Sequence, residues 1–163
     1  AVGVNLAGAN LQNTCWNGSD LRGAIATGAN LADSYFGSAN LQQANLDRVN
    51  AEGAQFNSTN LLNANLSQGN FTAANFLAAD MTLALLQGTD LDEASLQRAN
   101  LANATAFGAT FNGTNLLEAN LTGAVLTDAD LSGADQLTAD QVTAAITNAG
   151  TRLPPGIDVP PDF

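Results

Sequence analysis

Every fifth residue of this chain, from Leu6 to Leu131, is apolar. These 26 positions are mostly Leu or Phe, and no insertion interrupts their spacing. A helix repeats its apolar face every 3.6 residues and a strand every 2, so a period of five fits neither element. A strict short period sustained over such a length is typical of a solenoid, whose stacked units bury a core that no single unit can bury.

The residues around each apolar centre follow a pattern of their own. Two places before the centre stands a small residue, usually Ala, and the place directly before it is most often Asn or Asp. Residues 64–66, Ala-Asn-Leu, show the resulting motif A-(N/D)-L-x-x. The motif resembles that of the pentapeptide repeat family, and the resemblance extends from residue 4 to residue 135.

The resemblance implies an all-β fold, a right-handed quadrilateral parallel β-helix with four repeats to a coil. The centre and the small residue of each unit would point inward, and the other three residues would face solvent. Alternating large and small inward residues would fill a narrow square coil without voids. At the usual ~4.8 Å between stacked strands, about 6.5 coils would make a rod roughly 31 Å long.

A coil of twenty residues sorts the centres into vertical columns. One interior column contains Trp16, Phe36, Phe56 and Phe76, and Phe71 belongs to a different side of the coil. We therefore expect Phe76 to stack on Phe56, twenty residues away, more closely than on Phe71 beside it. Outside, Asn30, Asn50 and Asn70 align, and we expect such amides to bond to one another or to the backbone of the turns.

Glycine is frequent two places after a centre, at Gly8, Gly18 and Gly23 for example. Glycine there suits a corner turn that needs a positive φ. Many other units have no glycine at this place, so the sequence predicts that the turn type varies from corner to corner.

The repeat stops near residue 135, and the chain divides into a repeat region (1–135), a capping helix (136–150) and an extended proline-rich tail (151–163). Thr138 and Gln141 have the spacing of a capping box. We expect Gly150 to end the helix. An apolar helical stripe would close the end of the coil, and it consists of Val142, Ala145, Ile146 and Ala149.

At the other end the repeat begins almost at once, at Val4. The first coil would then be exposed, or covered by a partner or by a preceding segment of the chain. A solenoid end presents unpaired backbone groups. The sequence therefore leaves two states open, a monomer and an end-to-end dimer through the N-terminal coil.

Composition restricts the chemistry. The net charge is −11, and the four basic residues are all Arg, with no His and one Cys. Zinc sites and thiol–imidazole catalysis are not expected without His, and we predict no cofactor, no metal and no enzymatic activity. Nucleic acid and membranes are not expected partners of so acidic a chain. The compartment is open: cytoplasm, or periplasm or thylakoid lumen if a signal peptide was removed before Ala1.

The acidic residues are unevenly distributed. The side of the coil that carries Leu11, Leu31 and Ala51 has six acids and no base within the repeat, and we refer to it as the acidic face. It is a candidate partner-binding surface and consists of Asp33, Glu52, Asp90, Asp92, Glu93 and Asp130. Weak cation binding is the alternative for such acids. The predicted function is a non-catalytic structural or protein-interaction module with a rigid acidic surface and an unknown protein partner.

The family resemblance implies a second hypothesis, since some pentapeptide repeat proteins are acidic dimers that imitate duplex DNA and bind DNA gyrase. Duplex DNA carries one charge per ~1.7 Å, or roughly 18 charges over 31 Å. Six carboxylates on one face imitate this poorly, so DNA mimicry is the less favoured alternative. The outward apolar residues are predicted to be scattered, which gives only a weak indication of a hydrophobic interface; they are Leu62, Leu77, Leu83, Leu85, Phe107 and Leu117.

Overall fold

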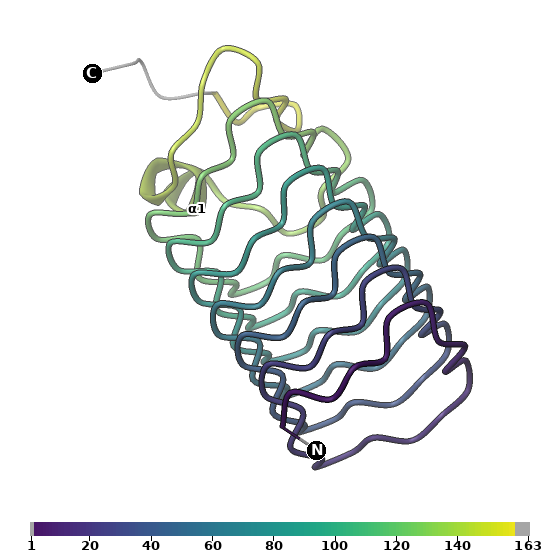
Figure 1. The fold of residues 1–163 in the computed structure, drawn as a ribbon. Coiled ribbons are helices and arrows are strands. Elements are labelled where there is room, and N and C mark those ends of the chain that lie inside the picture. The colour runs from purple at the N-terminus through teal and green to yellow at the C-terminus, as the bar shows by residue number, and fades with distance from the viewer. Residues whose placement is uncertain (1, 159–163) are drawn as a thin grey trace.

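The computed structural model describes residues 2–158, which form a rod of stacked square coils with the first and last of these residues at opposite ends (Figure 1). From Asn5↔Ile25 to Asn115↔Asp135, every bridge is parallel and joins residues twenty apart. One coil therefore takes four five-residue units. Each side of a coil pairs through a single bridge residue, so no side becomes a longer strand. The only helix in the described residues is α1, Ala139–Ala144.

Hydrogen bonds along the rod follow one scheme. The N–H of each centre except Leu121 donates to the next coil, as Leu6 does to the Ile25 carbonyl at 2.6 Å. The residue before a centre donates in the opposite direction, as Ile25 does to the Val4 carbonyl at 2.8 Å. Because each coil supplies both donors and acceptors to its neighbours, the ladder continues through the whole repeat.

The corners are uniform, which contradicts the prediction that the turn type varies. Each is a turn closed by a bond back to the centre, such as Ala9 N–H to the Leu6 carbonyl at 3.0 Å. The residue two places after the centre has a positive φ at every corner from Gly3 to Asp128. Ten of these 26 residues are glycines, yet Ala73 and Leu83 adopt the same conformation, with φ of 55° and 58°. The stacked ladder fixes the path of the backbone, and this overrides the residue preference at the corner.

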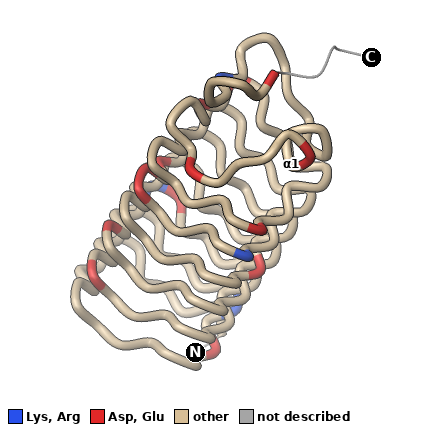
Figure 2. The backbone as a smooth tube through the Cα atoms, turned by 180° about the vertical axis from the view of Figure 1, so that it is seen from behind, with Lys and Arg blue, Asp and Glu red and all other residues tan. Residues whose placement is uncertain are grey.

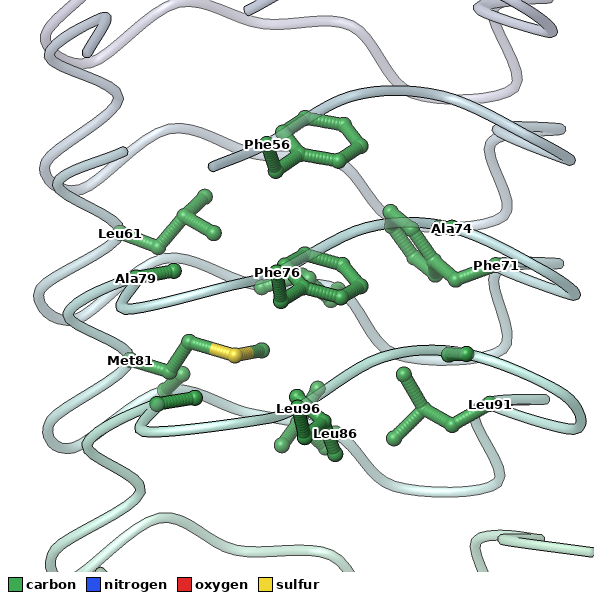
Figure 3. Packing of buried hydrophobic residues seen from close by; sticks show 14 of the residues in the cluster. Phe56, Leu61, Phe71, Ala74, Phe76, Ala79, Met81, Leu86, Leu91 and Leu96 are labelled. Atoms are coloured by element: carbon green, nitrogen blue, oxygen red, sulfur yellow. The ribbon is translucent and has the colours of Figure 1, made fainter. Parts of the chain in front are cut away.

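The core is a filled column, as Figure 3 shows. Phe56 and Phe76 stack with ring centroids 5.0 Å apart and planes 9° apart, whereas Phe71 meets Phe76 at 5.6 Å and 51°. The expected twenty-residue contact is therefore confirmed. Buried hydroxyls replace Ala at some inward places, and they bond to backbone carbonyls, as Thr59 does to Phe36 at 2.8 Å. Within the described residues every buried side-chain nitrogen or oxygen has a partner.

Helix α1 lies at the C-terminal end of the rod (Figure 1). The expected capping box is present, with Thr138 and Gln141 bonded reciprocally. The Gln141 side-chain amide also donates to the carbonyls of Leu116 and Ala119, at 2.8 and 2.9 Å. Val142 is fully buried. The helix thus covers part of the last coil, and its Gln141 side chain donates to carbonyls to which no further coil donates.

The helix is shorter than the predicted 136–150, and the predicted stripe and C-cap are wrong. It ends at Ala144, and the C-cap is Ala145, not Gly150. Ile146 leaves the helix because its backbone bridges Val125, which continues the ladder. Its side chain therefore points outward and is 52% exposed. The ladder offers two backbone bonds on an open edge, and these outweigh another helical turn.

The first residues of the predicted tail, 151–163, also belong to the coil. Arg152 bridges Asp130, and the buried Thr151 hydroxyl donates to the Leu126 carbonyl at 2.9 Å. Leu153 and Ile157 pack against the core. The tail prediction is therefore wrong for these residues, and its last part, 159–163, lies outside the described residues.

The first coil differs from the coils above it. Its centres Leu6, Leu11 and Trp16 are only half-buried, whereas the corresponding centres higher in the rod are buried. Trp16 stacks on Phe36 with a centroid separation of 6.5 Å. The end-to-end dimer through this coil stays a prediction.

Candidate interaction surface

The six acids of the predicted face lie on one side of the rod but not in one cluster. Asp33 and Glu52 belong to adjacent coils, and Asp90, Asp92 and Glu93 to one coil higher up. Uncharged places on this face separate the groups, since Asn70 lies between Asn50 and Asp90 in the bridge ladder and Thr110 lies between Asp90 and Asp130. The structure therefore brings together three of the six residues, and we call Asp90, Asp92 and Glu93 the acidic cluster.

The carboxylates of the acidic cluster bond to their neighbours. Asp90 Oδ1 accepts from the Asp92 N–H at 3.0 Å and from the Thr110 hydroxyl at 3.4 Å. Asp92 Oδ1 accepts from the Asn112 N–H at 2.9 Å. In the described part of the chain no group of three or more His, Cys, Asp or Glu is arranged to hold a metal ion. The cluster offers fixed negative charge at the surface.

Asp130 is not a free member of the face. Arg152 Nη1 lies 3.4 Å from Asp130 Oδ2. Hydrogen bonds from the Ser132 hydroxyl and N–H, with Arg152 close by, hold the pKa of the Asp130 carboxyl below its ordinary value. The acidic face, which has no base within the repeat, therefore gains one at this end, because the C-terminal segment returns to the coil and brings Arg152 with it.

All four arginines are engaged in ion pairs within the chain. The pairs are Arg22–Asp20, Arg48–Asp47, Arg98–Glu118 and Arg152–Asp130. The two hydrogen bonds from Arg22 lower the pKa of Asp20 to about 2. Figure 2 shows acidic positions along the rod and few basic ones. Acidic residues outnumber basic ones by eleven in the sequence, and none of the acids in residues 2–158 is buried.

Asparagine ladders explain much of the remaining outer surface. Asn30, Asn50 and Asn70 each donate to the amide oxygen of the residue one coil earlier, at 3.3, 3.2 and 3.1 Å. The same amide oxygens serve the turns, since Asn70 Oδ1 accepts from the Thr72 N–H at 3.0 Å. These residues are structural, as expected from the sequence.

One side of the rod lacks the usual Asn or Asp before its centres. Before the centres Leu86, Ala106 and Leu126, the outward place has Leu85, Thr105 and Val125 instead of Asn or Asp, and Ile146 extends the row. Phe107 and Leu83 lie beside it and are 50% and 46% exposed. We call Leu83, Leu85, Phe107, Val125 and Ile146 the apolar strip. The sequence predicted three of its members, Leu83, Leu85 and Phe107, to be scattered, and the row was not expected because Ile146 was predicted to lie in the helix.

The fold defines the chain as a β-helical solenoid. A family model described as pentapeptide repeats (8 copies) matches residues 5–43, 34–72, 79–116 and 107–135, which is well over half of the chain. The chain belongs to the pentapeptide repeat family, and its square coil is a right-handed quadrilateral β-helix. No curated protein matches the chain significantly in sequence.

Several solved structures are similar to this chain. QnrB1, a plasmid-mediated fluoroquinolone resistance protein, is 20% identical, with 91% of this chain and 79% of that chain covered and a TM-score of 0.41. A pentapeptide repeat protein from the Arabidopsis thaliana thylakoid lumen is 26% identical, with coverages of 85% and 82% and a TM-score of 0.41. HetL, involved in heterocyst differentiation regulation in the cyanobacterium Nostoc, is 24% identical, with coverages of 96% and 85% and a TM-score of 0.30.

Residues 2–158 contain no helix with the length and hydropathy needed to cross a bilayer.

Proposed function

We propose that this protein is a non-catalytic protein-interaction module that presents a rigid, acidic β-helical surface to a protein partner. The observation that carries the proposal is which polar groups of the rod are bonded within the chain and which are not. All four arginines and the buried hydroxyls are bonded inside the chain, and the unpaired carboxylates are left outside. A fixed field of one sign steers and selects a partner of opposite charge.

Catalysis is disfavoured by the arrangement of the acids. An acid–base pair needs two groups that converge on one substrate atom in a cleft. The hollow beside the first coil is lined by Gly3, Arg22, Gln42 and neighbouring residues, and its charged side chain, Arg22, is already bonded to Asp20. The acidic cluster lies instead on a flat side of the rod.

DNA mimicry stays the weaker alternative. Duplex DNA presents a charge every ~1.7 Å on a continuous spiral. On the acidic face, Asp33 and Glu52 are separated from the acidic cluster by a coil whose side on this face is uncharged, and Asp130 is paired with Arg152. Interruptions of this kind favour a partner with a local basic site over one that accommodates a duplex.

The test is capture of a partner from extracts of the source cell by the immobilised chain, with cross-linking before elution. We expect one protein at a stoichiometric ratio, released by salt because the attraction is largely electrostatic. An extract that yields no stoichiometric protein at low salt would contradict the interaction role. A variant with Asp90, Asp92 and Glu93 changed to Asn, Asn and Gln serves as the matched control.

A further inference from the structure

The apolar strip runs along one side of the rod, and Thr105 is the one polar residue in its row of bridge partners. Leu85, Thr105, Val125 and Ile146 are consecutive partners in the bridge ladder. Their outward side chains are therefore about 4.8 Å apart, and the row is roughly 14 Å long. Leu85, Phe107 and Ile146 are 40%, 50% and 52% exposed. Four of the eight large apolar residues that are exposed in the described structure lie in this strip.

The strip replaces a stabilising feature of the repeat. In sixteen units the Asn or Asp before the centre accepts a hydrogen bond from the backbone N–H two residues later. Leu85 and Val125 cannot accept this bond. The chain thus loses a turn bond and exposes apolar surface in the same row. Local departures from a stabilising rule are expected where a surface has a function.

The strip adjoins the acidic cluster. Leu85 and Asp90 belong to consecutive sides of one coil, joined by the corner at Gly88. Asp128 occupies the same corner two coils higher. Beyond Leu85 it is the only charged residue at the outward places of the strip's own side within the described chain. A neutral apolar row therefore runs directly beside fixed negative charge.

We propose that the apolar strip and the acidic cluster together bind an amphipathic helix of another protein, with an apolar face flanked by Lys or Arg. This inference rests on the interaction role proposed above and names its surface and partner chemistry. A row of roughly 14 Å matches the length of about ten helical residues. Apolar side chains of the helix would pack on Leu85, Phe107 and Val125, and its basic flank would face Asp90, Asp92 and Glu93.

A second copy of this chain fits the surface less well. It would bring an equal net charge of −11, with its own acidic cluster beside its own strip. Like charges placed together at an interface are unfavourable. The strip also has only five residues, whereas each partner of a stable dimer usually buries roughly 800 Å² from about 20–30 residues.

The decisive variant is Leu85→Asn/Val125→Asn, which restores the residue that the repeat prefers. Each new Asn can accept the turn bond, so we expect a melting temperature equal to or above that of the original chain. The matched control is Ile25→Asn, which lies in the same column near the other end of the rod and outside the strip. Both variants are full-length chains. Because a melting temperature equal to that of the original chain shows that a variant is folded, lost binding could then not be explained by lost folding.

The probes are two synthetic amphipathic helical peptides of about 15 residues. One contains Leu and Lys and the other Leu and Glu, with the same apolar spacing. Fluorescence anisotropy should show that the Leu/Lys peptide binds the original chain and the Ile25→Asn control, and that raised salt weakens binding. The Leu85→Asn/Val125→Asn variant should bind at least about tenfold more weakly, because two buried aliphatic contacts are lost. The Leu/Glu peptide should not bind.

Three results would overturn the inference. The first is equal affinity of the original chain and the double variant for the Leu/Lys peptide. The second is a dimer in sedimentation that the double variant converts to a monomer, because the occupant would then be a second copy. The third is capture of the same stoichiometric cellular protein by the double variant and by the original chain. This last result would leave the interaction role intact, whereas capture of no protein by either would contradict that role itself.

Discussion

The ring of Phe76 lies parallel to that of Phe56, twenty residues earlier, with centroids 5.0 Å apart. The sequence neighbour Phe71 lies 5.6 Å away at a tilt of 51°. Contacts in this protein therefore follow the coil and not the order of the chain. Both stacked rings are fully buried, so their loss should be felt by the coils above and below.

Phe76→Ala should destabilise the protein by about 3–5 kcal/mol, because a large buried ring leaves a cavity and two ring contacts are lost. Phe107→Ala is the control, since that ring is 50% exposed and its removal should change stability by less than about 0.5 kcal/mol. Urea unfolding followed by circular dichroism measures both. Similar losses for the two variants would contradict the buried stack.

Gly69→Ala should be destabilising although Ala is the usual residue at the inward small place. A Cβ on Gly69 would lie 2.6 Å from Phe71 Cε2 and 3.0 Å from the Leu66 carbonyl oxygen. Overpacking of this kind typically costs about 1–3 kcal/mol. The double variant Gly69→Ala/Phe71→Leu removes the obstructing ring and should recover part of the loss. A neutral Gly69→Ala would show that the ring moves aside freely.

Gln141→Ala should loosen the C-terminal closure, because the Ala119 carbonyl loses its bond from Gln141 and the Leu116 carbonyl keeps only its bond from the Ala119 N–H. The cost of two such bonds is about 1–3 kcal/mol. Amide hydrogen exchange should accelerate at Ile146 and Leu126, whose N–H groups bond across the last rungs. The amide of Leu61, far down the rod, is the internal control. Unchanged exchange at Ile146 would mean that α1 does not stabilise those rungs.

Acid should remove the contribution of the Asp20–Arg22 pair. The folded pKa of Asp20 is about 2, below the unfolded value of about 3.9. A depressed pKa gives stability that is present above pH 4 and is lost as the pH falls toward 2. The melting temperature of Asp20→Asn should therefore fall less steeply over this window. Asp80→Asn, in the same column, is the control, and parallel curves for Asp20→Asn and the original chain would contradict the assignment.

Gyrase supercoiling should be unaffected by this protein. The row of negative charges is interrupted along the acidic face, so this face offers few ionic contacts to a groove of gyrase that binds duplex DNA. A large excess should leave both supercoiling activity and quinolone sensitivity unchanged in a gel assay. Inhibition or protection at stoichiometric amounts would favour the DNA-mimic alternative, and the Asp90→Asn/Asp92→Asn/Glu93→Gln variant would then locate the effect.

The period of five residues, together with the four repeats per coil that the family resemblance implies, was enough to predict the coil, the columns and the stack of Phe56 on Phe76, because those depend only on register. It did not predict the uniform corners. Leu83 and Ala73 are poor candidates for a positive φ when judged alone, and only the neighbouring coils impose it. Local preference was therefore a weak guide wherever the stacked ladder fixes the backbone.

The candidate surface was predictable only in part. Asp90, Asp92 and Glu93 lie together as expected, since they share one unit. Arg152 and Ile146 were missed because both follow α1, where the offset in the ladder changes from twenty residues to 22 and 21. A spacing of twenty residues does not place either residue correctly. The pairing of Asp130 with Arg152 and the end of the apolar strip at Ile146 could therefore be found only in the structure.

The ladder has a consequence for how this molecule can change in evolution. The core repeats every five residues, whereas an outer column repeats every twenty. Inserting one unit between Leu85 and Val125 would keep an apolar centre at every inward place but rotate every later residue by a quarter turn, separating Leu85 from Val125. Inserting four would lengthen the rod and keep each column in line. Inward and outward residues are thus under different selective constraints. An insertion that still allows the chain to fold can nevertheless destroy a binding surface.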